Sequence, residues 1–380
     1  MPQGDSIQAD ADHDPRPGRT RPVPSLAELV DAVIGVDTHR DTHEAEIADA
    51  TGTPIATLKI GNDSAGFAVM LAWIAEHAPG PRIAVSLEGT RSYGVGLARA
   101  LTAAGVMVLE CEQPNRKQRR GKGKSDPIDA HLAVLAALRL DADRLPSVRT
   151  DGDREALRIL LGARQDISTA STAQTNRLRA LLLSGEDVDR QSARCALTDA
   201  ALAALARRRF PSGVSREHTV RHAEIRRLAL ALREAGQQLR QNRRELQAIV
   251  DDLAPGLTGR YGVGPVSAAQ AVVSFSHPGR CRNEAAFAAL AGTSPLPASS
   301  GRTVRHRLNR GGDRGLNRAI HTIALTRMRS CPRTRAYVER RTAEGKSSRE
   351  IRRCLKRYIA RELYRTLTQA MTPLIQQSAA

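Results

Sequence analysis

The chain has 380 residues, a formal net charge of +18 and 41% hydrophobic residues, but only 3% aromatic residues. This length suits two or three domains, with cores built mainly on aliphatic side chains. No run of about 18 apolar residues occurs, so no membrane-spanning helix is expected, and the N-terminal segment does not resemble a secretion signal. We expect a cytoplasmic protein whose five cysteines are reduced thiols rather than disulfides or zinc ligands.

The positive charge is concentrated in the C-terminal part of the chain. Residues 301–366 contain 20 Lys and Arg but only five Asp and Glu. Such a segment suits a polyanion, because neutralised phosphates release their counterions. A basic helix on a membrane surface is the alternative, and the lack of a face rich in Trp, Phe and Leu disfavours it.

The pattern along the chain predicts five segments. Residues 1–30 mix Asp, Pro, Arg and Gly without a period and are expected to be disordered. Residues 31–145 alternate short apolar runs with helical stretches, and residues 146–254 are dominated by long helical patterns. Residues 255–370 are expected to form a small, mainly helical domain, and 371–380 a tail.

The elements expected in residues 31–145 follow the order β-β-β-α-β-α-β-α. Strands are predicted at 32–37, 43–48, 55–60, 83–88 and 106–110, and helices from Ser64 onward, at 95–104 and at 127–140. Three hairpin-linked strands followed by alternating helices and strands is the order of the RNase H-like fold, an analogy at the level of fold alone. We therefore predict an α/β domain joined to an all-α remainder.

Four carboxylates stand where that fold carries its catalytic acids. Asp37 ends the first strand, Glu88 ends the fourth, and Asp126 and Asp129 open the last helix, with Asp126 as the N-cap before Pro127. Carboxylate oxygens suit Mg²⁺, and two such metal ions can clamp the attacking and leaving oxygens of a phosphoryl transfer. The alternative for each residue taken singly is an ordinary capping or solvated carboxylate.

A basic loop leads into this last helix. Its glycines and cations would bring phosphate to the paired aspartates, whereas the alternative is a solvated loop. The cations are Arg116, Lys117, Arg119, Arg120, Lys122 and Lys124. Three histidines, His39, His43 and His131, do not have the spacing of a structural zinc site, and we expect them at the surface or supporting the metal ligands.

Residues 225–253 carry the most regular periodicity in the chain. Apolar residues recur at alternating steps of three and four over four heptads, which predicts a coiled-coil seam with one polar member, Asn242, that fixes the register. The seam requires a partner helix. We favour self-association, as a dimer or tetramer, over an intramolecular helical hairpin with residues 151–183.

Two features of the C-terminal domain point to phosphate. The turn at Gly262 and Gly264 resembles a helix-hairpin-helix, which offers backbone amides to a phosphate, although a simple packing turn is the alternative. Ser299 and Ser300 lie in a loop whose hydroxyl could attack a phosphodiester while guanidiniums stabilise the developing charge. The guanidiniums are those of Arg302, Arg305, Arg307 and Arg310.

These motifs together resemble the IS110-family transposases, which are DEDD-type recombinases of insertion sequences. The resemblance rests on motifs that occur in the same order along residues 32–366: Gly35-Val36-Asp37-Thr38-His39, Leu87-Glu88-Gly89-Thr90-Arg91-Ser92-Tyr93, Gly123-Lys124-Ser125-Asp126-Pro127-Ile128-Asp129-Ala130, Tyr261-Gly262-Val263-Gly264-Pro265, Ala291-Gly292-Thr293-Ser294-Pro295, Ser299-Ser300-Gly301 and Leu308-Asn309-Arg310-Gly311-Gly312-Asp313.

The resemblance implies a RuvC-like domain whose DEDD set, Asp37, Glu88, Asp126 and Asp129, binds Mg²⁺. It also implies a nucleophilic serine placed directly before a glycine, which makes Ser300 the choice over Ser299. It further implies covalent serine–DNA links, multimers with sites shared between subunits, and a non-coding guide RNA that pairs with donor and target DNA.

Two other functions compete with this one. A metal-dependent, structure-specific nuclease such as a Holliday-junction resolvase needs the carboxylates but no serine, and leaves a nick without a protein–DNA adduct. A non-catalytic RNA- or DNA-binding protein needs neither, although four intact acids argue against it.

Overall fold

The computed structural model describes residues 23–111, 126–149, 151–209, 214–297, 306–307, 309 and 311–372. For residues 126–128, 144 and 306–307 the backbone alone is described. The chain forms two compact units, the first ending at Val148 and the second beginning at Arg149. Most of the predicted N-terminal extension, 1–22, and most of the predicted tail, 373–380, lie outside the described residues.

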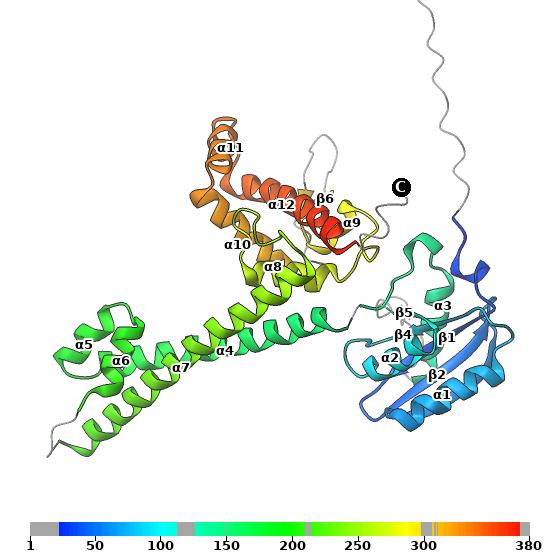
Figure 1. The fold of residues 1–380 in the computed structure, drawn as a ribbon, viewed down its shortest axis with the longest axis horizontal. Helices are drawn as coiled ribbons and strands as arrows, with labels where there is room; N and C mark the ends of the chain where they lie inside the picture. The colour runs from blue at the N-terminus through cyan, green and yellow to red at the C-terminus, as the bar shows by residue number, and fades with distance from the viewer. Residues whose placement is uncertain are drawn as a thin grey trace, which may run out of the picture. The chain divides into compact units, whose positions relative to one another are not determined.

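The first unit is an α/β domain built on a five-stranded mixed sheet with the order β3-β2-β1-β4-β5 (Figure 1). β1 pairs antiparallel with β2 and parallel with β4. This is the predicted order of elements, and it is consistent with an RNase H-like domain. The elements are β1 (Ala32–Thr38), β2 (Thr42–Asp49), β3 (Pro54–Gly61), α1 (Ser64–His77), β4 (Ile83–Leu87), α2 (Val95–Ala103), β5 (Met107–Glu110) and α3 (Asp126–Leu138).

Both faces of this sheet are covered, which explains the almost unbroken apolar run of β1. Side chains of β1 alternate between the faces. Ile34 and Val36 belong to the core shared with α1 and α2, and Val33 belongs to the core shared with α3. Gly35 also faces α3, and a Cβ there would lie 2.0 Å from the carbonyl oxygen of Ala130. A glycine is therefore required for α3 to lie this close to the strand.

The second unit begins with a long helical hairpin, visible in green in Figure 1. Its arms α4 (Asp153–Leu183) and α7 (Arg216–Leu253) pack together, with α5 (Asp187–Arg194) and α6 (Asp199–Arg207) between them in the sequence. Near one end, Leu228 of α7 shares a core with Leu178 of α4, and near the other Leu246 shares a core with Leu157. The predicted seam is thus buried within one chain, against residues 151–183.

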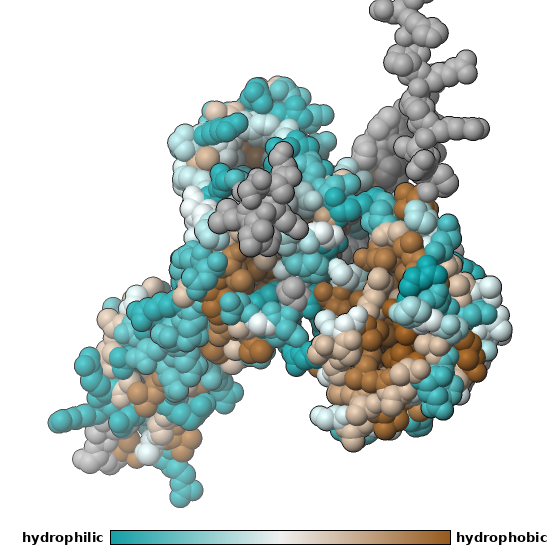
Figure 2. All heavy atoms as spheres, turned by 45° about the vertical axis from the view of Figure 1, so that its right-hand side comes forward, coloured by the Kyte–Doolittle hydropathy of each residue, from teal (hydrophilic) through white to brown (hydrophobic). Residues whose placement is uncertain are grey.

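Asn242, the polar member of the seam, makes its contacts inside this hairpin. Its side chain is 5% exposed, and its Nδ2 donates to the carbonyl oxygen of Leu160 at 2.9 Å. Arg164 of α4 donates to the carbonyl oxygen of Leu239 at 3.0 Å and to Asn242 Oδ1 at 3.4 Å. Hydrophilic residues dominate the visible face of the hairpin in Figure 2, as expected when its apolar stripe is turned inward.

The C-terminal helices pack on the base of the hairpin. Phe275, Phe287, Ile320 and Leu363 lie in a core that also contains Leu157 of α4. No helix in the described ranges is both long and apolar enough to cross a membrane. The remaining elements are α8 (Pro265–Phe275), α9 (Glu284–Leu290), β6 (Leu296–Pro297), β7 (His306–Arg307), α10 (Arg314–Ser330), α11 (Pro332–Ala343) and α12 (Ser348–Met371).

Candidate metal centre and nucleic-acid interface

Asp37 and Glu88 lie next to each other where two parallel strands end. Val36 is paired with Leu87 in the β1–β4 register, and the Glu88 amide donates to the carbonyl oxygen of Val36 at 3.3 Å. The carboxyl ends of parallel strands are where α/β sheets generally bind ligands. The two predicted acids are thus brought together by the sheet itself.

Helix α3 brings the second pair of acids toward the same strand. Ala130 and Val134 lie against Gly35, and Asp37 follows Gly35 by two residues, on the same face of β1. Asp129 precedes Ala130 directly and is partly exposed. The helix begins at Asp126 itself, one residue earlier than predicted, a difference within the usual spread of helix boundaries. The Asp126 side chain lies outside the described residues.

Strand β2 adds two acids that the sequence analysis missed. Glu44 is paired with Asp37, and Glu46 with Gly35, so both glutamates face α3. Glu46 is 7% exposed and lies 2.5 Å from Nδ1 of His131, whereas Glu44 binds Lys59 at 2.8 Å. In the sequence, Glu44 and Glu46 alternate with Ala45 and Ile47, and this alternation is the pattern that indicates their shared face. It normally indicates a solvated face, but here α3 covers that face.

The chemistry of this donor set fits a hard divalent cation. Asp37, Glu88 and Asp129 offer carboxylate oxygens, which Mg²⁺ prefers over nitrogen or sulfur ligands. Among the side chains that the structure describes, which do not include that of Asp126, no group of three or more His, Cys, Asp or Glu is arranged to hold a metal ion. A bound ion at this edge would therefore draw on Asp126 or on a small rearrangement of these carboxylates.

The three histidines near these acids have different surroundings. His43 is fully buried, stacks on Phe67, and has its Nε2 3.0 Å from Asn62 Oδ1. Burial lowers the pKa of His43, because the charged imidazolium loses its hydration. His131 joins α3 to β2 through Glu46, as a residue that supports the helix carrying Asp126 and Asp129. His39 is exposed in the turn between β1 and β2.

In the second unit, a two-stranded ribbon brackets the predicted serine segment. β6 and β7 pair antiparallel, with Leu296 opposite Arg307 and Pro297 opposite His306. The segment 298–305 between them lies outside the described residues, and so do Ser299, Ser300, Arg302, Arg305 and Arg310, as well as the side chain of Arg307. The ribbon fixes the two points at which this segment begins and ends.

The chain that follows the ribbon is anchored by several hydrogen bonds. Asp313 caps α10 by accepting from the Leu316 amide at 2.9 Å, and it also accepts from Ser274 Oγ of α8 at 2.6 Å. Gly312 has a positive φ of 91°, and a Cβ there would lie 2.3 Å from the carbonyl oxygen of Leu290. Only glycine fits this close approach.

A second anchor joins α10 and α12 to the loop before the ribbon. Asn317 Nδ2 donates to the carbonyl oxygen of Ala291 at 2.6 Å, and Lys356 Nζ donates to Asn317 Oδ1 at 2.6 Å. Burial lowers the pKa of Lys356. The same ammonium group and Arg352 contribute to lowering the pKa of His321, after the larger effect of burial.

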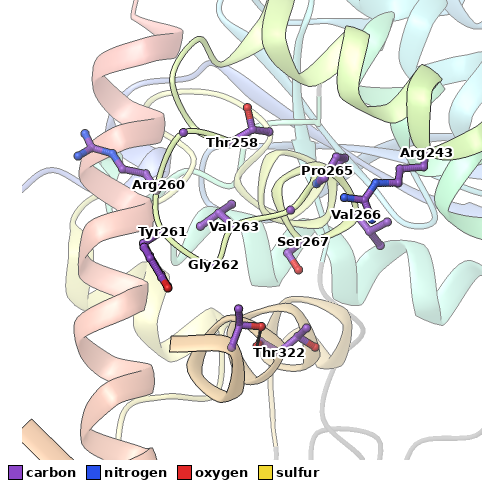
Figure 3. A pocket seen from close by; sticks show the side chains of 13 residues that line it. Arg243, Thr258, Arg260, Tyr261, Gly262, Val263, Pro265, Val266, Ser267 and Thr322 are labelled. Carbon is purple, nitrogen blue, oxygen red and sulfur yellow. Dashed lines mark hydrogen bonds between the residues drawn. The ribbon is translucent and has the colours of Figure 1, made fainter. Parts of the chain in front are cut away.

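The predicted glycine-rich turn lies at the start of α8, beside a cleft of about 590 Å³ (Figure 3). Gly262 has a positive φ of 76°, and Gly264 is the N-cap of α8. The cleft is lined by the turn itself, by Arg243 of α7 and by Thr322 and Thr326 of α10. Its resemblance to a helix-hairpin-helix stays a prediction, but a turn and a helix N-terminus do open onto a cleft here.

The six cations predicted to lead into α3 lie in 112–125, outside the described residues. Of the predicted nucleic-acid contacts, the described ones are therefore Gly262 and Gly264. The strand order of the first unit is consistent with an RNase H-like domain that carries several acids at one edge of its sheet. Comparisons with known proteins make the class more specific.

Two transposase family models match the chain. The first matches mainly the first unit, and the second matches part of the second unit. The IS110-type DEDD transposase model, described as "Transposase", matches residues 34–185, and the "Transposase IS116/IS110/IS902 family" model matches residues 257–339. Together they cover well over half of the chain. The first match contains Asp37, Glu88, Asp126 and Asp129, and the second contains Gly262, Gly264 and Ser300.

Two proteins of Streptomyces coelicolor are similar to the chain. The 43.6-kDa protein of insertion element IS110 is 30% identical over 271 residues, which are 60% of this chain and 66% of that protein, just under two thirds. The protein described as the mini-circle transposase for IS117 is 24% identical over 407 aligned positions, covering 91% of this chain and 98% of that protein. The chain belongs to the IS110 family of transposases, enzymes that act on DNA.

Proposed function

We propose that the chain cuts and rejoins DNA through the Ser300 hydroxyl, assisted by a divalent metal ion, Mg²⁺, held by Asp37, Glu88, Asp126 and Asp129. The observation that carries this proposal is the side-by-side position of Asp37 and Glu88 at the ends of β1 and β4, with Asp129 on the helix packed against β1. Membership of the transposase family supports DNA as the substrate.

In the proposed reaction Ser300 Oγ attacks a DNA phosphorus. An Oγ–P bond forms, the bond from phosphorus to one DNA oxygen breaks, and the serine proton ends on water or on the leaving oxygen. Arg302, Arg305, Arg307 and Arg310 stabilise the negative charge on the oxygens of the five-coordinate phosphorus. Attack by a free DNA hydroxyl on the serine–phosphate bond reverses the step and rejoins the strands. The metal ion would supply charge neutralisation at the phosphate oxygens.

The proposal extends to the partners of the chain. The concentration of Lys and Arg in residues 301–366 suits a polyanion, and the family resemblance extends these contacts to a non-coding guide RNA as well as DNA. The cations in 116–124 would hold the backbone of either strand near the four acids. We further propose a dimer or tetramer in which the acids of one subunit serve the serine of another.

Trapping of a covalent adduct tests the serine directly. The chain is incubated with labelled DNA carrying the ends of its own element, the reaction is stopped with detergent, and protein-linked label is measured. Ser300→Ala should abolish the adduct and leave DNA binding unchanged, whereas the neighbouring Ser299→Ala should form it at the normal level. Strand exchange by Ser300→Ala at the wild-type rate would refute the role of this serine.

The acids are tested by a matched pair of variants. Asp126→Asn should remove Mg²⁺-dependent activity, whereas Asp153→Asn, an aspartate in the first turn of another helix, should retain it. Full activity of the chain in the presence of a chelator would contradict the metal role. The competing function, a structure-specific nuclease, predicts nicks without any adduct, so the same gel separates the two.

A further inference from the structure

The cleft beside the glycine-rich turn carries a more specific inference. We propose that it binds one phosphate of an unpaired nucleic-acid strand and that Tyr261 stacks on the base next to that phosphate. This rests on the proposed function in taking nucleic acid as the partner, and it adds the form of the strand and the residues that bind it.

The start of α8 provides free backbone donors. The helix has 11 residues, its N-cap Gly264 has no side chain to cap it, and Pro265 at its first position has no N–H. No backbone acceptor among the described residues takes the amides of Val266 and Ser267. Unsatisfied amides at a helix N-terminus, together with the helix dipole, favour an anion.

Ser267 is a second, independent indication of a ligand. Its side chain is only 9% exposed, and it makes no hydrogen bond with the described part of the chain. Figure 3 shows its hydroxyl aimed into the cleft, toward the gap between the turn and α10. Its oxygen is absent from the fully solvent-excluded side-chain atoms that lack a partner, so it is reached from the cleft and can take a hydrogen-bond partner there. An oxygen of a bound phosphate would supply that partner.

The charge of the cleft also favours phosphate. Arg243 and Arg260 line it, and no Asp or Glu is among its lining residues. Within the described ranges neither guanidinium forms a salt bridge, whereas Arg221, Arg227 and Arg233 of α7 each form one. In Figure 3 Arg243 extends toward Val266 at the start of α8, whereas the Arg260 guanidinium points away from it. A guanidinium without an acidic partner, near free amides, matches the anion chemistry of a phosphodiester.

Tyr261 makes the site specific for an unpaired strand. Its side chain is 49% exposed and lines the cleft. Its carbonyl oxygen accepts from Arg327 Nε at 2.8 Å, and Arg327 is held by both oxygens of Glu362, at 2.7 and 3.1 Å. The ring is thus presented from a fixed backbone. A base can stack on it only when it is not stacked inside a duplex, and a cleft of about 590 Å³ has room for a group of the size of a nucleotide.

The test is an equilibrium binding experiment that involves no chemistry. Full-length Ser300→Ala protein is titrated against fluorescent 12-nucleotide DNA, RNA of the same sequence, and the matching DNA duplex, and anisotropy is measured. Tyr261→Ala should weaken binding to the single strands about tenfold and leave duplex binding within twofold. Tyr261→Phe keeps the ring and should bind as the parent does.

The phosphate contacts are tested by two further variants. Ser267→Ala should weaken single-strand binding several-fold, and Arg243→Gln should make the salt dependence of binding shallower by about one phosphate contact. The controls are Tyr358→Ala, an equally exposed tyrosine on α12, and Arg244→Gln on α7, since neither lines the cleft. Both controls should bind as the parent does, and thermal melting checks that each variant is folded.

Each outcome has a defined meaning. Equal losses for single strands and duplex in Tyr261→Ala would overturn the unpaired-strand assignment, and unchanged binding in all three cleft variants would overturn the site itself. The DNA and RNA arms show which strand the cleft prefers, and a loss in either one supports the proposal. Because adduct formation is measured separately with the wild-type chain, failure of the serine proposal would leave this result intact.

Discussion

Gly35→Ala tests the close packing that brings α3 to the acids of the sheet. A Cβ on residue 35 would lie 2.0 Å from the carbonyl oxygen of Ala130 and 2.9 Å from Val134 Cγ2 and the Val134 amide nitrogen. Two of these three neighbours are backbone atoms, so no side-chain rotation relieves the clash. The helix must move away from β1 by more than about 1 Å to reach ordinary van der Waals distance.

The displacement has two measurable effects. Overpacking of this kind costs about 1–3 kcal/mol of folding free energy, which urea denaturation would show as a lower midpoint. A misplacement of about 1 Å can also reduce a rate by about 100-fold, and Asp129 is next to the residue that must move. We therefore expect Mg²⁺-dependent adduct formation to fall by about two orders of magnitude under conditions in which the variant remains folded.

The matched control is Gly162→Ala in the middle of α4. Apart from the adjoining backbone of α4, no described atom lies within 4 Å of the Cβ that this substitution adds, so it should stabilise the helix by up to about 1 kcal/mol without loss of activity. Wild-type activity together with wild-type stability in Gly35→Ala would refute the reasoning, since α3 could not then lie where the structure places it.

Three further predictions concern other contacts. Asn242→Leu should leave the oligomeric state unchanged in light scattering, because Asn242 contacts Leu160 of the same chain; a new oligomeric state would contradict the intramolecular hairpin. Glu46→Gln should lower the free energy of unfolding by roughly 1–3 kcal/mol through loss of the charge-assisted bond to His131, and an unchanged urea midpoint would argue against that bond. The pKa of His43 is lowered in the fold, so the unfolded chain takes up the proton first, and stability should fall as pH drops below about 6.5; His43→Gln should show a shallower fall over the same range in pH-dependent melting.

The sequence was sufficient to locate Asp37 and Glu88 because strand ends are marked in it. An apolar run that stops at a carboxylate indicates both a buried strand and the edge at which it emerges. The order of elements then predicted which edges meet, and the parallel pairing of β1 with β4 has that arrangement. The sequence does not show that α3 packs over β2. Glu46 alternates with apolar residues as a solvated residue would, and only the position of α3 makes it buried.

The seam of α7 shows a different limit of sequence reasoning. A heptad pattern states that a helix has a partner, but it does not state whether that partner belongs to the same chain. Residues 153–183 carry their own apolar positions, yet with a less regular period, and the pattern alone therefore favours a second copy of α7 as the partner. The short helices α5 and α6 allow the chain to return, and Leu178 and Leu157 of α4 fill the seam instead.

The C-terminal motifs contain two kinds of residue. Some anchor the chain on either side of the β6–β7 ribbon, and the others belong to the segment between the two strands, which this anchored part would hold in place. Gly312 permits a backbone contact that no other residue allows, and Asp313 ties α10 to α8. On the other side, Asn317 holds the Ala291 carbonyl that precedes the ribbon. Pro297 and His306 are paired, so the segment containing Ser300 begins and ends at this one anchored part of the chain.

Reactive groups gain most from being held on a rigid part of the fold, because the cost of orienting them is met during folding. If Ser300 is the nucleophile, then Ser274→Ala, which removes one hydrogen bond to Asp313, should slow adduct formation more than it weakens DNA binding.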